Sequence, residues 1–278
     1  MDPSLRSNGS STKPPIPAST RPGNRSRLAG RVDRVLNTAL AGERASVLNV
    51  TVAELLSEPR AVATLFEDAL DQRGVGLLGH WMVHELLRRS QLYDELLNSL
   101  ASPNPLTRAA AARICSAARL TDSLVWVADM LEDPNPRVRE AAVRALAQIG
   151  GRRAVELLIG SGDRIPLYRL AIALSRAATD VEIEALMRQP ASERIAVATA
   201  LACGLRCDVL RISPLLGIAH DRRWPKQVRV AACKSLAMIG DASAADGLKR
   251  LALYDPDTDM KGAADRAHRR LVKRAMTR

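Results

Sequence analysis

Aromatic side chains are scarce in this chain of 278 residues. They make up 3% of it, with a single Phe, whereas hydrophobic residues reach 47%. The apolar content is therefore mostly Ala, Leu, Val and Ile. Ala and Leu are strong helix formers, and small Ala side chains let helices approach one another closely. Because sheet-rich folds usually carry more aromatic and β-branched residues, this composition favours an all-α fold.

Cysteine is sparse as well, and its spacing excludes a disulfide framework. Cys115, Cys203, Cys207 and Cys233 each lie in an Ala-rich stretch, where a small buried side chain is expected. The C-x3-C formed by Cys203 and Cys207 has no second pair and no His close by in sequence, which argues against zinc. We expect four reduced, structural thiols and a cytoplasmic setting.

Long apolar runs are also missing. No stretch approaches the length of a membrane span, and the N-terminus lacks the apolar core of a secretory signal. Residues 1–27 are instead rich in Pro, Ser and Arg, with few large aliphatic side chains. Such a segment cannot offset the entropy of ordering, so we predict a disordered basic tail. Its acid-poor composition, shared with transit peptides and some secreted-effector leaders, leaves a targeting role open.

The formal charge of +11 lies wholly at the two ends. Residues 1–34 carry seven Lys/Arg against two Asp, a net of +5, and residues 261–278 carry seven against one, a net of +6. Since 5 + 6 = 11, residues 35–260 are neutral. Basic ends attract phosphates, acidic proteins or anionic lipid head groups, and they also act as plain solubilising tails.

The sequence repeats itself at shifts near 30 residues. Residues 133–150 read D-P-N-P-R-V-R-E-A-A-V-R-A-L-A-Q-I-G, and matching positions return 31 residues earlier and 30, 90 and 122 residues later. Such shifts indicate a helical hairpin that buries its apolar face only by stacking on its neighbours, and thus an α-solenoid. The units are expected at 91–118, 120–150, 152–178, 180–204, 208–240 and 242–274. Residues 28–90 are predicted to be divergent capping hairpins, and residues 275–278 a basic C-terminal end.

The segment at 133–150 carries a family resemblance. Its D-P-x-P-x-V-R-x-A-A-x-x-A-L-x-x-I-G pattern resembles HEAT repeats, in particular the short bacterial kind also found in phycobilin lyases. The resemblance covers roughly residues 91–274 and concerns the repeat architecture. It implies a stack of antiparallel helical hairpins, and it says little about activity.

A basic residue recurs six positions after the turn position of the repeats. HEAT repeats are similar in having an Asp at the turn and a following Arg that link neighbouring hairpins as a ladder. We therefore expect an architectural role for these side chains. The ladder should be weaker where Ser102 and Arg223 replace the Asp, although Asp221 is a candidate substitute for the latter. The basic members are Arg108, Arg139, Arg169, Arg229 and Lys261, and the acidic members are Asp133, Asp163 and Asp255.

A second basic series lies five residues further along the repeats, with Leu174 interrupting it. In HEAT-like solenoids the second helix of each hairpin lines the concave surface, so by resemblance these side chains form a basic strip there. Such a strip would suit an acidic peptide or a phosphate backbone. The alternative is a solvated helix face balanced by acids such as Glu140. The members are Arg113, Arg144, Lys234 and Arg266.

Trp224 lies in a predicted inter-helix loop beside Arg222 and Arg223. An aromatic side chain among cations is typical of a binding hot spot or a stacking platform for a nucleobase. An equally good interpretation is that Trp224 folds back on its own hairpin. Trp81 and Trp126 fall within helical patterns, and we expect them to be buried or half-buried.

Catalytic motifs are missing: there is no nucleophile elbow, phosphate-binding loop or dinucleotide fingerprint. His80 and His84 have i, i+4 spacing and Glu85 follows, but no third ligand is near, so no metal or cofactor is predicted. Deoxyhypusine hydroxylase looks similar in architecture but uses repeated His-Glu pairs for a di-iron centre, and this chain has one such pair. HEAT-like DNA glycosylases, whose concave groove is lined by Trp and Asp, leave Trp126 with Asp129 as an enzyme alternative. Bilin lyases are another enzyme alternative, which rests on the type of repeat alone.

The function that we expect is that of a non-catalytic scaffold or adaptor. It would bind a macromolecular partner, most simply a protein, through a solenoid surface. Nucleic-acid binding through the basic ends and the concave strip is the alternative, and the two HEAT-like enzyme classes are further ones. The sequence names neither the partner nor the oligomeric state.

Overall fold

The structure is a computed structural model, and it describes most of the chain after residue 90. Its described residues are 30–34, 37–38, 41, 81–82, 84–85, 87–89 and 91–277. The predicted tail at 1–27, most of the capping hairpins predicted for 28–90, and His80 lie outside them. Within the described ranges the secondary structure is helical and includes no strand. The predicted all-α solenoid fold is confirmed.

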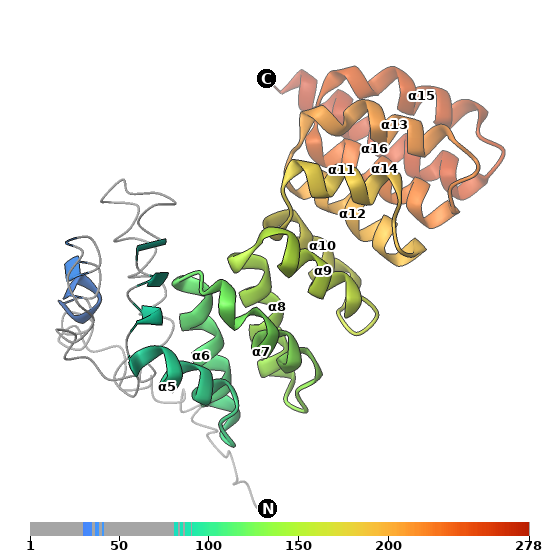
Figure 1. Cartoon of the computed structure of the whole chain (residues 1–278). Helices are drawn as coiled ribbons and strands as arrows, with labels where there is room; N and C mark the ends of the chain where they lie inside the picture. Colours follow the sequence, from blue (N-terminus) through green and yellow to red (C-terminus); the bar gives the residue numbers. More distant parts are fainter. Residues whose placement is uncertain are drawn as a thin grey trace, which may run out of the picture.

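Residues 91–277 form six helical hairpins, each with a first and a second helix (Figure 1). The first helices are α5 (Gln91–Leu100), α7 (Leu124–Asp129), α9 (Gly151–Gly160), α11 (Asp180–Arg188), α13 (Ile212–His220) and α15 (Ala245–Tyr254). The second helices are α6 (Pro105–Ala117), α8 (Pro136–Ile149), α10 (Leu167–Ala177), α12 (Glu193–Leu205), α14 (Lys226–Ile239) and α16 (Thr258–Met276). Four short 3₁₀ turns flank three of the first helices, α7, α13 and α15; they are Thr121–Ser123, Met130–Glu132, Val209–Arg211 and Ala242–Ala244.

Local sequence sets where the second helices begin and end. Asn104 and Asn135 cap α6 and α8, and the side chain of each accepts a hydrogen bond from a backbone N–H of the first turn. A Pro follows each cap, where its missing N–H costs nothing. Gly150 and Gly240 end α8 and α14 with φ of 70° and 77°, a conformation that an L side chain adopts only with strain.

The core runs along the stack because each second helix packs on the second helix of the next hairpin. The Ala positions of the repeat lie at these contacts and are fully buried: Ala111, Ala142, Ala171, Ala232 and Ala264. A methyl side chain lets two helix backbones approach closely, so larger residues there would push the hairpins apart. The repeat pattern therefore encodes the contact between hairpins as well as the helices themselves.

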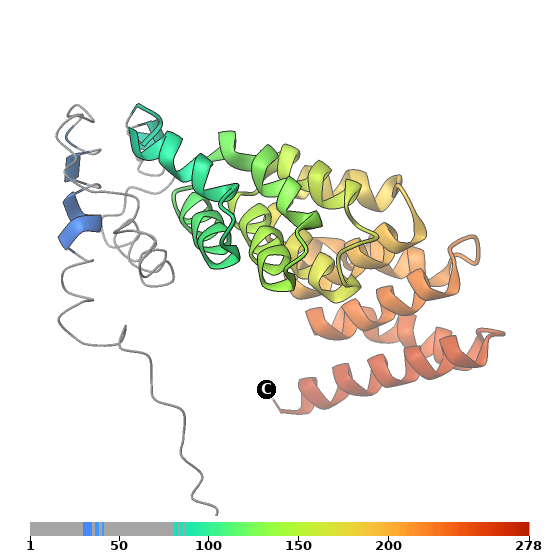
Figure 2. The same cartoon turned by 90° about the horizontal axis from the view of Figure 1, so that it is seen from below.

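The hairpins follow one another along an arc from α5 to α16 (Figures 1 and 2). The second helices form its inner row, because side chains from α10, α12, α14 and α16 line one common hollow. The first helices form the outer row. No helix among the described residues has both the length and the apolar character needed to cross a bilayer.

Two tryptophans differ from expectation. Trp81 is 61% exposed and Trp126 is 44% exposed, although both lie in helical segments for which burial was predicted. Trp126 belongs to α7, a helix of only six residues in the outer row. Val125 beside it is exposed too, so helical periodicity alone could not tell the exposed side of this short helix from the buried one.

Candidate partner-binding groove

The predicted ladder forms at two of its links. Arg108 makes a bidentate contact with Asp133 of the next hairpin, with Nε to Oδ2 at 2.7 Å and Nη2 to Oδ1 at 3.0 Å. Arg229 pairs through Nη2 with Asp255 of the next hairpin, and its Nε donates to the carbonyl of Ala219 at 2.9 Å. The Arg229 pair is buried, and the Arg108 pair is partly buried. They join neighbouring hairpins and are architectural.

Elsewhere the ladder is discontinuous. Arg139 turns back on its own hairpin and donates to the carbonyls of Asp133 and Pro134 at 2.7 and 3.0 Å. Arg194 takes over the link at the next turn, because it donates to the carbonyl of Gly162 at 2.9 Å and to that of Ile165. Asp163, in that turn, is exposed, and Lys261 is half-buried. Arg169 pairs with Glu140 instead of with a turn Asp.

The loop around Trp224 is held by Asp221. Its side chain accepts a hydrogen bond from the backbone N–H of Arg223 at 2.9 Å, and its carbonyl accepts one from the N–H of Trp224. Trp224 is half-buried and packs against the core, while Arg222 and Arg223 are exposed. This arrangement favours the interpretation in which Trp224 closes its own hairpin. Its two Arg neighbours stay available to a partner.

The residues predicted to form a concave basic strip fall into separate places. Arg113 is half-buried on α6, and Arg144 lines a groove between α8 and α10. Lys234 and Arg266 lie together over α14 and α16. The strip is broken at α12, whose only Lys or Arg is Arg194 at its first turn. The concave face thus carries two distinct basic hollows.

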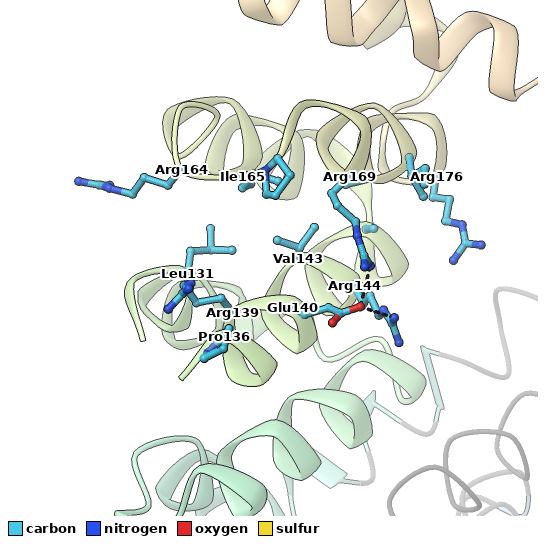
Figure 3. Close-up of a pocket in the computed structure, with 14 residues that line it drawn as sticks. Leu131, Pro136, Arg139, Glu140, Val143, Arg144, Arg164, Ile165, Arg169 and Arg176 are labelled. Carbon is cyan, nitrogen blue, oxygen red and sulfur yellow. Dashed lines mark hydrogen bonds and ion pairs between the residues drawn. The ribbon is translucent and has the colours of Figure 1, made fainter. Parts of the chain in front are cut away.

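The groove between α8 and α10 is the larger hollow, with a volume of about 620 Å³ (Figure 3). Its floor is apolar and includes Leu131, Val143, Ile165 and Ile172. Five Arg residues and one acidic residue, Glu140, are among those that line it, so its lining residues have a formal net charge of +4. The cations are Arg139, Arg144, Arg164, Arg169 and Arg176.

Glu140 joins the two walls of this groove. Its Oε1 accepts a hydrogen bond from Arg169 Nη1 of α10 at 2.6 Å and one from Arg144 of α8 (Figure 3). The hydrogen bond from Arg169 and the nearby charge of Arg144 hold the pKa of Glu140 below its usual range. These side chains remain 38–60% exposed, and ion pairs in solvent contribute only about 0–1 kcal/mol. These contacts therefore contribute little to the stability of the fold.

Sequence reasoning named Arg144 as a binding candidate, gave Arg139 and Arg169 an architectural role instead, and missed Arg164 and Arg176. Arg164 lies in the turn before α10 and pairs with Glu132 at 2.7 Å. Arg176 follows Arg169 by seven residues on α10, a spacing that returns a side chain to the same helix face. That spacing was the available signal. No comparable signal marks Arg164 in the sequence, because the position of its side chain depends on the conformation of an irregular turn.

The described residues give no support for a metal site or for the glycosylase alternative. No group of three or more metal-binding side chains occurs among them. His84 faces Asp122, with Nε2 and Oδ2 3.7 Å apart. Trp126 and Asp129, which that alternative requires in the concave groove, belong to α7 of the outer row.

Comparisons with known proteins bear on the architecture. A family model described as HEAT repeats matches residues 93–175. Among solved structures, human deoxyhypusine hydroxylase in complex with glycerol matches with a TM-score of 0.35 and 16% identity, covering 91% of this chain and 100% of that chain. An engineered protein matches with a TM-score of 0.32 and 17% identity, covering 87% and 97%. No curated protein sequence matches the chain.

The match falls on the hairpins whose sequence pattern and stacking are described above. It does not support the narrower resemblance to phycobilin lyases. A family model for HEAT repeats thus covers residues 93–175, and stacked helical hairpins of the same kind continue to residue 277.

Proposed function

We propose that this protein is a non-catalytic adaptor that binds an acidic segment of a partner protein in the groove between α8 and α10. The observation that carries the proposal is the composition of the groove. Five Arg side chains surround an aliphatic floor, and one carboxylate opposes them. A partner segment with alternating acidic and apolar side chains matches both features, since Arg forms bidentate bonds with carboxylates and the floor buries apolar groups.

The cellular setting that we propose is the cytoplasm. Within the described chain all four cysteines are free, and Cys115, Cys203 and Cys233 are buried. Burial raises the pKa of the Cys115 thiol to about 12, so it stays protonated and unreactive at neutral pH. Reduced, inert thiols are what a protein of a reducing compartment carries.

The test is the affinity of fluorescent peptides measured by anisotropy. An acidic peptide with interspersed Leu should bind, while the peptide with Lys in place of each acid should not. Replacing both Arg144 and Arg169 by Gln should weaken binding at least about tenfold, the equivalent of about 1.4 kcal/mol. Binding should also fall as salt is raised, because exposed charges are screened.

A matched control separates the groove from overall charge. Arg152→Gln with Arg188→Gln removes the same charge from two exposed side chains of the outer row, on α9 and α11. This variant should bind the acidic peptide as the wild type does. Equal losses of affinity in the two variants would contradict the proposed function. So would a wild-type protein that does not bind the acidic peptide at low salt.

Nucleic-acid binding is a second candidate, favoured by the charge of α16. This helix carries six Lys or Arg against two Asp. Its test is the affinity for mixed single- and double-stranded oligonucleotides as a function of salt, because each phosphate contact makes the dependence steeper. Binding that is absent at low salt would remove this candidate.

A further inference from the structure

A second hollow lies on the concave face, on the other side of α10. Four second helices line it, and its volume is about 310 Å³. Tyr168, its contribution from α10, directly precedes Arg169 of the first groove. The two hollows therefore adjoin through one helix. The main side chains of the second are Tyr168, Leu201, Lys234, Met238, Arg266 and Arg270.

Unlike the groove between α8 and α10, this hollow has no acidic residue among those that line it. No carboxylate of the described chain lies within 4.0 Å of Lys234, Arg266 or Arg270, and no acidic residue is among those that line the hollow. Asp265, on the same helix, is already paired with Arg269 at 2.9 Å. Three positive charges thus line one hollow without a carboxylate partner among the described residues, and all three side chains are exposed to an incoming anion.

The charge and shape of the hollow indicate which kind of anion it would bind. A carboxylate brings one negative charge, whereas a phosphoryl group brings between 1.5 and 2 at neutral pH and three strong acceptor oxygens. Arg266 and Arg270 are four residues apart on α16, so they lie on one face, and Lys234 approaches from α14. The walls beneath are Leu201 and Met238, both half-buried, which suit the aliphatic stem of a modified side chain.

The same observations disfavour a nucleic-acid backbone. A strand of phosphates requires a continuous track of cations. Along the inner row the track stops at α12, where Arg194 is engaged with backbone carbonyls and Arg206, just after the helix, donates to the carbonyl of Ala178 at 2.7 Å. Two separate groups of cations fit a peptide better than they fit a nucleic-acid strand.

We infer that the second hollow binds the phosphoryl group of a phosphorylated side chain in the partner segment. This inference rests on the proposed function, since the same segment lies in the groove between α8 and α10 and crosses α10 at Tyr168. Tyr168 is 57% exposed and contacts the segment as it passes. Binding of the partner is then controlled by its phosphorylation.

The experiment uses three labelled peptides with the full-length protein. They have one neutral, flexible sequence with phosphoserine, Ser or Glu at the centre, and none carries the acidic segment that tests the groove. We expect the phosphoserine peptide to bind at least tenfold more tightly than the Ser peptide and more tightly than the Glu peptide. Replacing Lys234, Arg266 and Arg270 by Gln should abolish that preference, and Arg270→Gln alone should reduce it.

Control variants make each outcome decisive. The triple variant Arg152→Gln, Arg188→Gln, Lys249→Gln loses the same charge at exposed positions outside the hollow and should keep the preference. Thermal unfolding shows that each variant is folded. A phosphoserine peptide that binds no better than the Ser peptide overturns the inference, as does a preference that survives the triple variant in the hollow.

The outcomes also separate this inference from the proposed function. If the acidic peptide binds in the groove but phosphoserine gives no gain, the adaptor function stands and the phosphoryl site is overturned. If neither peptide binds, both fail. A single-stranded oligonucleotide that binds through Lys234, Arg266 and Arg270, together with indifference to phosphoserine, overturns the phosphoryl site in favour of nucleic acid.

Discussion

At the scale of single residues, Asp255 joins two hairpins through one buried ion pair. Its side chain is 3% exposed, that of Arg229 is 7% exposed, and it also accepts a hydrogen bond from the N–H of Asp257 at 2.9 Å. We predict that Asp255→Ala lowers the free energy of unfolding by about 3–5 kcal/mol, because it leaves a buried guanidinium without its counter-charge. Urea denaturation measures this directly.

The control for that prediction is the exposed acid four residues later. Asp259 pairs with Lys226 at 2.6 Å, and the two side chains are 71% and 50% exposed. Asp259→Ala should cost no more than about 1 kcal/mol, because solvent screens the pair. Similar losses for the two variants would show that burial of the Arg229 pair contributes little.

Asp133 gives a prediction about pH. The hydrogen bond from Arg108 lowers the pKa of Asp133 below its ordinary value of 3.8, so the folded protein binds this proton less readily than the unfolded chain. The resulting stabilisation is fully present above about pH 5 and is lost as the pH falls from 3.8 through the folded pKa. Wild-type stability between pH 6 and pH 3 should therefore fall more steeply than that of Asp133→Asn. Parallel curves would exclude this role.

At the scale of elements, the contact between α12 and α14 depends on Gly204. A Cβ there would approach Ser235 Cα of α14 to 2.8 Å, closer than real Cβ contacts. We predict that Gly204→Ala destabilises the protein by about 1–3 kcal/mol, because the two helices must move apart. Thermal and urea unfolding of the purified variant measure the effect.

Gly217 supplies the matched control. It also lies inside a helix, α13, but nothing lies within 4 Å of the position its Cβ would take. Gly217→Ala should stabilise the protein by up to about 1 kcal/mol, since Ala is the better helix former. If both substitutions have the same sign, helix propensity outweighs the packing of α12 on α14.

The sequence predicted these elements well because the repeat encodes them locally. Pro, Asn and Asp at the turns and Gly after Ile149 and Ile239 fix where the second helices begin and end, and the Ala pairs fix which sides touch. The hollows were not predictable in the same way. Which Arg faces which acid depends on turn conformation: Arg139 returns to its own turn, and Arg169 reaches Glu140 on the neighbouring helix. Tyr168 and Arg270 line the same hollow because four hairpins stack side by side.

At the scale of the whole molecule, the described repeats depend on their nearest neighbours. Each second helix packs on the one before and the one after, and the basic hollows lie between such helices. In a stack of this kind, stability is approximately a sum of units and interfaces, so damage at one end should stay near that end. A globular domain with one central core would instead lose protection throughout.

This difference predicts the result of removing residues 241–278. The truncated chain loses α15, α16 and Asp255, so Arg229 loses its partner and the buried face of α14 meets solvent. Hydrogen exchange should become fast in α14 and remain slow in α6, α8 and α10, while the groove between α8 and α10 still binds the acidic peptide. The phosphoserine preference should vanish, because Arg266 and Arg270 are gone. Fast exchange throughout residues 91–240 would instead mean that the repeats fold as one cooperative unit that requires its C-terminal hairpin.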